Sequence, residues 1–203
     1  MNTLMKTIEV LGIIAFALTG IYEARKKGMD IVGVYSVGMI TAFGGGTLRD
    51  LTLNRHPLFW IQHYEYAAFL LALSVVSTMK IEQLFQKKNV VNFVLALDAL
   101  GLGSFSASGA SLADQFGCAP FVSSLIGVIT GVFGGVMRDI ICNEIPYVFQ
   151  RSELYATCAF IGAWAYLIVN HAGGNDISAV CACIGVTFML RMFAIRYKIT
   201  LPI

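Results

Sequence analysis

The chain has 203 residues, of which 57% are hydrophobic and only 13% are charged, and its mean hydropathy is +0.74. A water-soluble domain of this size could not bury so much apolar surface, so the composition excludes soluble classes and predicts a membrane protein. The net charge of +2 is too small to indicate a nucleic-acid partner.

Seven apolar segments follow one another along the chain. A helix that crosses the roughly 30 Å hydrocarbon core of a bilayer needs about 20 residues, and each segment approaches or exceeds that length. They cover residues 7–24, 30–54, 60–79, 90–112, 119–142, 154–170 and 177–195. In the first segment a basic cluster, residues 25–27, follows the apolar run. In a cleaved signal peptide the basic residues come before the apolar run, so we expect this segment to be retained. The sequence therefore predicts an all-α membrane protein with seven transmembrane helices.

Lysine and arginine are distributed unequally between the two sides of such a protein. With seven spans, successive connecting segments lie on opposite sides of the membrane. Three of the 14 basic residues then fall on the same side as the N-terminus and eleven on the other side. Cytoplasmic segments carry the excess of positive charge, so we expect the N-terminus outside and the C-terminus in the cytoplasm. The expected location is the inner (plasma) membrane, where the basic loops would meet anionic lipid headgroups.

The sequence repeats itself after 89 residues without a gap. In the densest stretch, residues 38–57 and 127–146 share nine identities in twenty positions. Each copy contains three spans, an odd number, so the second copy must enter the membrane from the opposite side. We expect a first three-helix repeat over 1–86, an inverted repeat over 90–172, and a seventh helix with the cytoplasmic C-terminus over 176–203. This last helix has no counterpart and is expected to be an accessory packing helix.

Both copies carry adjacent glycines followed by an arginine–aspartate pair, in the second and fifth spans. Glycine has no side chain and a low helix propensity, so a pair of glycines favours a local kink or break, which frees backbone carbonyls. Such carbonyls are tolerated at membrane depth only where protein or a water-filled cavity surrounds them. Carbonyl and carboxylate oxygens can replace part of the hydration shell of a monovalent cation. The motif therefore predicts an ion pathway.

Ionisable residues inside spans are costly and usually face a cavity or a partner, and here the same pair occurs twice at equivalent positions. We expect the aspartates to favour cations, and the arginines to pair with them or with helix ends. The candidate pathway residues are Thr41, Gly44, Gly45, Gly46, Arg49, Asp50, Thr130, Phe133, Gly134, Gly135, Arg138 and Asp139. Glu9 and Asp98, also equivalent in the repeat, either line the same path or form buried hydrogen bonds to a neighbouring helix.

Close helix packing is the alternative interpretation of the glycines. Small residues recur every four positions from 38 to 46 and from 127 to 135, which is typical of faces that let helices approach closely. Packing of this stripe leaves Gly45 and Gly134 unexplained because they lie off it, and it does not account for the charged pairs. Both interpretations can hold for different glycines.

The doubled glycine and arginine–aspartate motif, the inverted repeat and the unpaired seventh span resemble the trimeric intracellular cation (TRIC) channel family. Bacterial members are also grouped as a glycine-transporter domain family. The resemblance covers essentially the whole chain. It implies a homotrimer with one pore per subunit, conducting potassium and sodium, and lined by glycine-kinked second and fifth helices. Phe133 departs from the pattern because it replaces the first glycine of the second copy, and its ring could act as an apolar gate.

Two functions remain open at this stage. One is a passive cation channel, and the other is a secondary transporter of a small zwitterion such as glycine, which would use the same inverted repeats for alternating access. An enzyme is not expected, because no metal-like histidine or cysteine set and no nucleophile with a matching base can be identified. We expect no cofactor, and no metal beyond the permeating cations.

Overall fold

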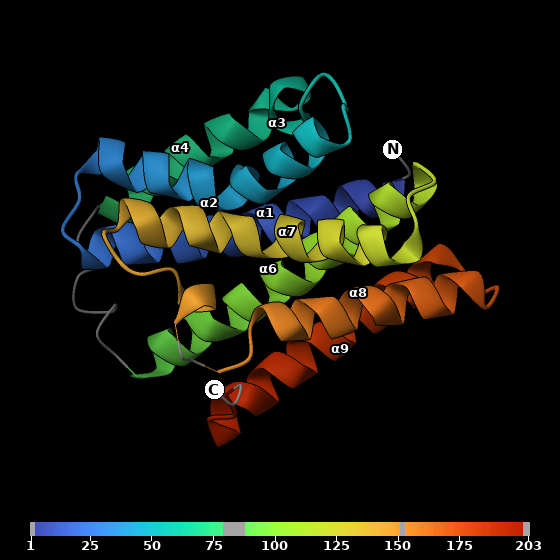
Figure 1. Ribbon diagram of the computed structural model, residues 1–203. Helices are drawn as coiled ribbons and strands as arrows, with labels where there is room; N and C mark the ends of the chain where they lie inside the picture. The colour runs from blue at the N-terminus through green and yellow to red at the C-terminus, as the bar shows by residue number, and fades with distance from the viewer. Residues whose placement is uncertain (1–2, 79–87, 151–152, 201–203) are drawn as a thin grey trace.

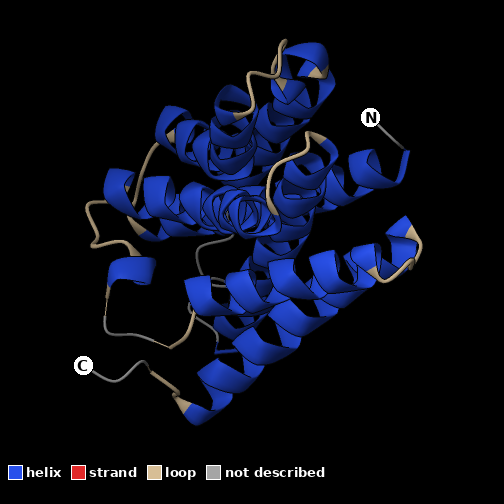
Figure 2. Ribbon diagram, turned by 45° about the vertical axis from the view of Figure 1, so that its right-hand side comes forward, coloured by secondary structure: helices blue, strands red, loops and turns tan. Residues whose placement is uncertain are grey.

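A computed structural model describes residues 3–78, 88–150 and 153–200. Its named elements are all helices joined by short loops (Figure 2). The helices are α1 (Thr3–Lys26), α2 (Ile31–Thr52), α3 (Phe59–Gln62), α4 (Tyr64–Thr78), α6 (Lys88–Gln115), α7 (Pro120–Ile141), α8 (Ala156–His171) and α9 (Asp176–Tyr197), with a 3-10 turn, η1 (Tyr147–Phe149), between α7 and α8. The prediction of an all-α protein is confirmed.

Local sequence signals set the ends of the two helices that carry the motif. Asp30 caps the start of α2 by accepting a hydrogen bond from the Gly33 amide at 2.8 Å, and Pro120 occupies the first turn of α7, where its missing amide costs nothing. Two residues beyond the end of each helix lies an asparagine with positive φ, 50° at Asn54 and 56° at Asn143. Asparagine tolerates this left-handed conformation well, so it terminates a helix as glycine often does.

Helices α1, α2, α6 and α7 form the middle of the molecule. Helix α1 packs against α2 and α6, and α7 packs against both α2 and α6. Helix α4 covers α2 on one flank, while the pair α8 and α9 covers α6 on the other (Figure 1). Helices α2 and α7 run in opposite directions, so their C-terminal ends lie at opposite ends of the molecule (Figure 1).

Among the residues that the structure describes, five helices are long and apolar enough to cross a membrane, namely α1, α2, α6, α7 and α9. Helices α4 and α8 are apolar but have only 15 and 16 residues. The expected third span, 60–79, is divided at His63 between α3 and α4, and its last residue lies outside the described chain. Large apolar side chains such as Val32 on α2, Phe69 on α4 and Met189 on α9 are exposed, as expected for surfaces that face lipid.

Two phenylalanines form the centre of the core. The rings of Phe16 on α1 and Phe105 on α6 have centroids 5.3 Å apart, and both side chains are fully buried. Phe105 packs against Gly12, and Phe16 packs against Gly101, so each ring lies on a glycine of the opposite helix. The two phenylalanines are 89 residues apart in the sequence, and so are the two glycines. The contact of Phe105 with Gly12 is therefore the counterpart of the contact of Phe16 with Gly101.

Candidate functional site

Helices α2 and α7 are continuous through their glycines, which corrects the expectation of a broken helix. The α-helical conformation runs unbroken from residue 31 to 52 and from 120 to 141. Helix α2 nevertheless changes direction along its length (Figure 1). The glycines therefore do not free a set of backbone carbonyls, because a bend can be distributed over several helical hydrogen bonds that remain formed.

Gly45 and Gly134 have a packing role that the sequence pattern did not indicate. A Cβ atom on Gly45 would overlap the carbonyl oxygen of Thr130, and one on Gly134 would overlap the carbonyl oxygen of Thr41. The backbones of α2 and α7 thus touch directly where they cross, a contact that only glycine permits. The stripe residue Gly38 instead packs against Ile21 of α1, so Gly45 meets a different neighbouring helix.

Gly46 and Gly135 each lie beside the arginine that follows three residues later, because residues three apart are neighbours on a helix surface. The Cβ position of Gly46 lies 3.8 Å from Nη2 of Arg49, and that of Gly135 lies 3.7 Å from Nη2 of Arg138. These are ordinary van der Waals distances, so the arginines by themselves do not require glycine at either position.

The first charged cluster surrounds Arg49, whose guanidinium is completely buried. Its Nε donates to Asp50 Oδ1 at 2.9 Å, and its Nη2 donates to Glu9 Oε1 at 2.6 Å. Its Nη1 donates to the hydroxyl of Ser108 on α6 at 2.6 Å. Arg55 forms a further ion pair with Asp50 at 3.3 Å. Two carboxylates and two guanidinium groups are thus assembled with balanced charge.

The second charged cluster surrounds Arg138 in the equivalent arrangement. Its Nε donates to Asp139 Oδ1 at 2.9 Å, and its Nη1 donates to Asp98 Oδ1 at 3.0 Å. The same Nη1 reaches the hydroxyl of Thr19 on α1 at 3.3 Å. The backbone amide of Tyr147 donates to the other oxygen of Asp139 at 2.9 Å. The structure therefore brings Arg138, Asp139 and Asp98 together, as it does Arg49, Asp50 and Glu9.

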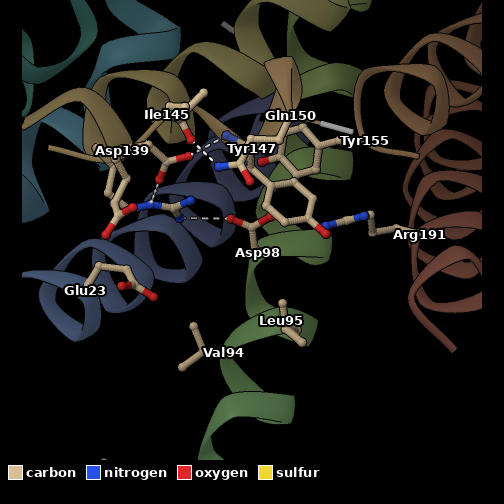
Figure 3. Close-up of a pocket in the computed structure, with 12 residues that line it drawn as sticks. Glu23, Val94, Leu95, Asp98, Asp139, Ile145, Tyr147, Gln150, Tyr155 and Arg191 are labelled. Carbon is tan, nitrogen blue, oxygen red and sulfur yellow. Dashed lines mark hydrogen bonds and ion pairs between the residues drawn. The ribbon is translucent and has the colours of Figure 1, made fainter. Parts of the chain in front are cut away.

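The two clusters differ in their access to the exterior. Beside Glu9 and Gly46 there is a space of only about 10 Å³, close to the volume needed for a single water. Beside Arg138 there is an open cavity of about 250 Å³ (Figure 3). Its charged lining comprises Glu23, Asp98, Arg138, Asp139, Glu144 and Arg191. The first cluster is sealed and the second is open.

Arg191 of α9 lines this cavity. The seventh helix therefore contributes to the site and is not solely the accessory packing helix that the sequence led us to expect. Arg191 is 2% exposed, and its guanidinium carbon lies 4.9 Å from the ring centroids of both Tyr147 and Tyr155. Figure 3 shows it reaching from α9 toward these two rings. The signal in the sequence was an arginine within an apolar segment, which usually faces a cavity or partner.

Several other residues of the clusters were missed at the sequence level. Thr19 and Ser108 are one such pair, and since they are 89 residues apart with a hydroxyl in both, the repeat could have identified them. Position 55 is equivalent to position 144, but one is Arg55 and the other is Glu144. Matching identical residues between the two copies does not reveal positions such as these, where the charge is reversed.

The remaining predicted residues lie away from the open cavity. Thr41 and Thr130 are fully buried, and each hydroxyl donates at 2.6 Å to the carbonyl oxygen four residues earlier in its own helix. Phe133 lines a separate apolar hollow of about 450 Å³ on the outer side of α2 and α7, where its ring lies 3.9 Å from the Cβ position of Gly44. Neither threonines nor Phe133 are among the described residues that line the charged cavity.

An exposed ion pair lies at the edge of the cavity, outside the long helices. Lys27, which follows α1, donates to Oε1 of Glu144, which follows α7. The lysine lowers the pKa of the Glu144 carboxyl below its usual range, chiefly through this hydrogen bond, and the pKa of Lys27 is raised for the same reason. The pair thus connects the ends of α1 and α7.

Comparisons with known proteins match nearly the whole chain. The family model described as "Glycine transporter" matches residues 6–80 and 95–171, and the second match begins 89 residues after the first. The UPF0126 inner membrane protein YadS of Escherichia coli K12 is 34% identical over 96% of this chain and 93% of its own length. A UPF0126 membrane protein of Vibrio cholerae is 32% identical over 99% and 83%, respectively.

Solved structures of similar proteins also match nearly the whole chain. A TRIC cation channel from a study of the structural basis of conductance is 37% identical, with a TM-score of 0.85, covering 98% of this chain and 96% of that one. The TRIC orthologue from Rhodobacter sphaeroides is 33% identical, with a TM-score of 0.88, covering 97% and 99%. Both similarities extend over the charged clusters and the helices that carry them.

Proposed function

Because this chain belongs to the TRIC channel family, we propose that it is a homotrimeric channel for monovalent cations, potassium and sodium, with one pore in each subunit. The observation that carries the proposal is the doubled cluster of an arginine with two carboxylates, one at the C-terminal end of α2 and one at that of the antiparallel α7. A path that joins the two clusters would cross the bilayer between the two halves of the chain.

The proposed membrane architecture has seven spans in two inverted repeats, 1–86 and 90–172, followed by a seventh helix over 176–203. Helices α1, α2 and α4 correspond to α6, α7 and α8. The reciprocal contacts of Phe16 with Gly101 and of Phe105 with Gly12 support this correspondence, because a two-fold axis generates such exchanged pairs. The orientation of the chain, N-terminus outside and C-terminus in the cytoplasm, follows from the distribution of basic residues.

The proposed pathway is lined by the predicted residues of α2 and α7. In the sealed cluster, Oε2 of Glu9 and Oδ2 of Asp50 are buried and have no hydrogen-bond partner in the described chain. Each carboxylate therefore keeps an oxygen that a hydrated cation could use as a ligand. In the chosen orientation the open cavity faces the cytoplasm and the sealed cluster lies toward the outside.

The crossing of α2 and α7 is the proposed constriction. There Gly45 and Gly134 bring the backbones into contact, and the ring of Phe133 lies beside Gly44. Opening would require α2 and α7 to separate at this point, since direct backbone contact leaves no room for an ion. The bend of α2 gives one way to do this without breaking the helix.

A carrier for a small zwitterion is the second candidate. The cavity supports it because carboxylates and guanidinium groups line the same 250 Å³ space, as a ligand with an amine and a carboxylate would require. Asp98 and Arg138 are already paired with each other at 3.0 Å, however, and a ligand would have to displace that pair. This cost favours the channel.

Recordings from purified protein in a planar bilayer test the proposal. A channel is expected to give discrete current steps that reverse near the potassium equilibrium potential in a potassium chloride gradient. Saturable glycine uptake by proteoliposomes, without unitary currents, would instead establish the carrier. Chemical cross-linking of the detergent-purified protein tests the homotrimer, for which bands at one, two and three times the 22.0 kDa chain mass, and none above, are expected.

A further inference from the structure

Arg191 of α9 differs from the two repeated arginines in its partners. Arg49 and Arg138 are each paired with two carboxylates. The Nη1 atom of Arg191 instead donates to the carbonyl oxygens of Glu153 at 3.1 Å and Leu154 at 2.9 Å. No ion pair joins Arg191 to a carboxylate within the part of the chain that the structure describes. In that part of the chain its positive charge is therefore buried without a direct ion-pair partner.

The surroundings of Arg191 hold this charge in a fixed position. The guanidinium lies between the rings of Tyr147 and Tyr155, at 4.9 Å from each centroid, where the ring faces attract a cation. The two carbonyl dipoles add to this stabilisation without removing the net charge. A cation held in this way can remain ionised at low exposure, because neutral groups replace its hydration shell.

An ion that enters the cavity experiences the electric field of the Arg191 charge. Arg191 is part of the lining, together with four carboxylates and Arg138, and low-dielectric walls strengthen the field inside such a cleft. Asp98 and Asp139 share the single positive charge of Arg138, while Glu144 is paired with Lys27 and Glu23 with Lys26. One negative charge therefore remains on the lining, and the charge of Arg191 offsets it in the potential that a cation meets.

We infer that Arg191 is a selectivity and barrier residue for the cation pathway, contributed by the helix that stands outside the two repeats. This inference rests on the proposed function. It assigns α9 an electrostatic role: a fixed positive charge lowers the occupancy of the cavity by cations and limits the current through it. No equivalent charge is supplied by α9 to the sealed cluster, whose lining comes from α1, α2, α3 and α6 in the described chain.

The test compares unitary potassium currents of four variants. Arg191→Gln removes the charge and is expected to raise unitary conductance severalfold at low salt, with a smaller increase at high salt, because ions screen the field. Arg191→Lys keeps a charge and is expected to resemble the wild type. Arg196→Gln, at an exposed position on the same helix, is the matched control and is expected to have no effect.

A fourth variant keeps the test decisive if Arg191→Gln does not fold. Leu95 lines the same cavity, so Leu95→Glu adds a negative charge there while leaving the contacts of Arg191 in place (Figure 3). It is expected to raise conductance as Arg191→Gln does. Unchanged currents in Leu95→Glu and in folded Arg191→Gln would overturn the inference, and so would equal effects of Arg191→Lys and Arg191→Gln. A wild-type protein without unitary currents would instead overturn the proposed function on which the inference rests.

Discussion

Gly45 of α2 lies directly against the carbonyl oxygen of Thr130 on α7. The same contact occurs with the roles exchanged, between Gly134 of α7 and the carbonyl oxygen of Thr41 on α2. The two helices are therefore held together by backbone contact at their crossing, with no side chain between them. This contact fixes how closely the two halves of the molecule approach each other.

The first prediction concerns these two glycines. Gly45→Ala and Gly134→Ala should each lower the free energy of unfolding by about 1–3 kcal/mol, the usual cost of overpacking, because the new methyl group meets rigid backbone. The measurement is the thermal stability of the detergent-purified protein. Gly185→Ala on α9 is the control, since nothing lies within 4 Å of its Cβ position, and it should be neutral or stabilising by up to about 1 kcal/mol. Equal effects at all three positions would contradict the proposed crossing.

A second prediction separates the two aspartates of the motif. Asp139→Asn should reduce unitary potassium conductance severalfold in folded protein, because Asp139 lines the open cavity and its charge attracts cations. Asp139→Glu, which keeps the charge, serves as its control. Asp50→Asn should also reduce conductance or selectivity, but with a loss of stability, since it removes a fully buried partner of Arg49. Unchanged currents and reversal potentials in both asparagine variants would exclude these carboxylates from the pathway.

The aromatic ring at the crossing gives a third prediction. Phe133→Gly restores the glycine of the first copy, removes the bulk beside Gly44, and should raise the open probability of the channel. Single-channel records give open probability separately from conductance, which should change little because Phe133 does not line the charged cavity. If the folded variant shows no gain in open probability, Phe133 is not a gate.

The fourth prediction uses the pH dependence of the exposed ion pair. Lys27 lowers the pKa of Glu144, so in the wild type this carboxylate stays charged to a lower pH than an unpaired glutamate would. The contribution of the pair to stability is present above the pKa of Glu144 in the unfolded chain, and it is lost as the pH falls through the lowered folded value. Lys27→Met should move the Glu144 titration, followed by carboxylate infrared absorption, to higher pH. A titration at the same pH in both proteins would show that the pair does not form.

Much of the fold could be predicted from the sequence, because hydropathy and charge placement act locally. Helices α2 and α7 end at Thr52 and Ile141, within two residues of the ends predicted at 54 and 142. Lengths were less certain, since α3 and α4 divide one apolar segment and the boundary depends on tertiary packing near His63. The seven-span count and the orientation stay predictions.

The charged residues of the candidate site could be predicted from the sequence, but the conformation of the helices that carry them could be predicted only in part. Identity between the copies selected Arg49 and Arg138 with their aspartates, and equivalence added Glu9 and Asp98, which are the ion-pair partners in the structure. Of the expected kink or break, only a bend of α2 occurs and both helices stay continuous (Figure 1). Glycine also permits close packing, and the two uses cannot be separated without knowing what lies opposite. The difference between a sealed and an open cluster depends on long-range contacts, such as those of Arg191, that no local pattern contains.

Each arginine of the motif reaches across to the other half of the chain. Arg49 donates to Ser108 of α6, and Arg138 donates to Thr19 of α1, so neither cluster is complete within its own three helices. A half-chain expressed alone would bury a guanidinium group short of one acceptor, which makes independent folding of either half unfavourable. Two separately produced halves should therefore become stable only after they associate with each other and each supplies the missing acceptor.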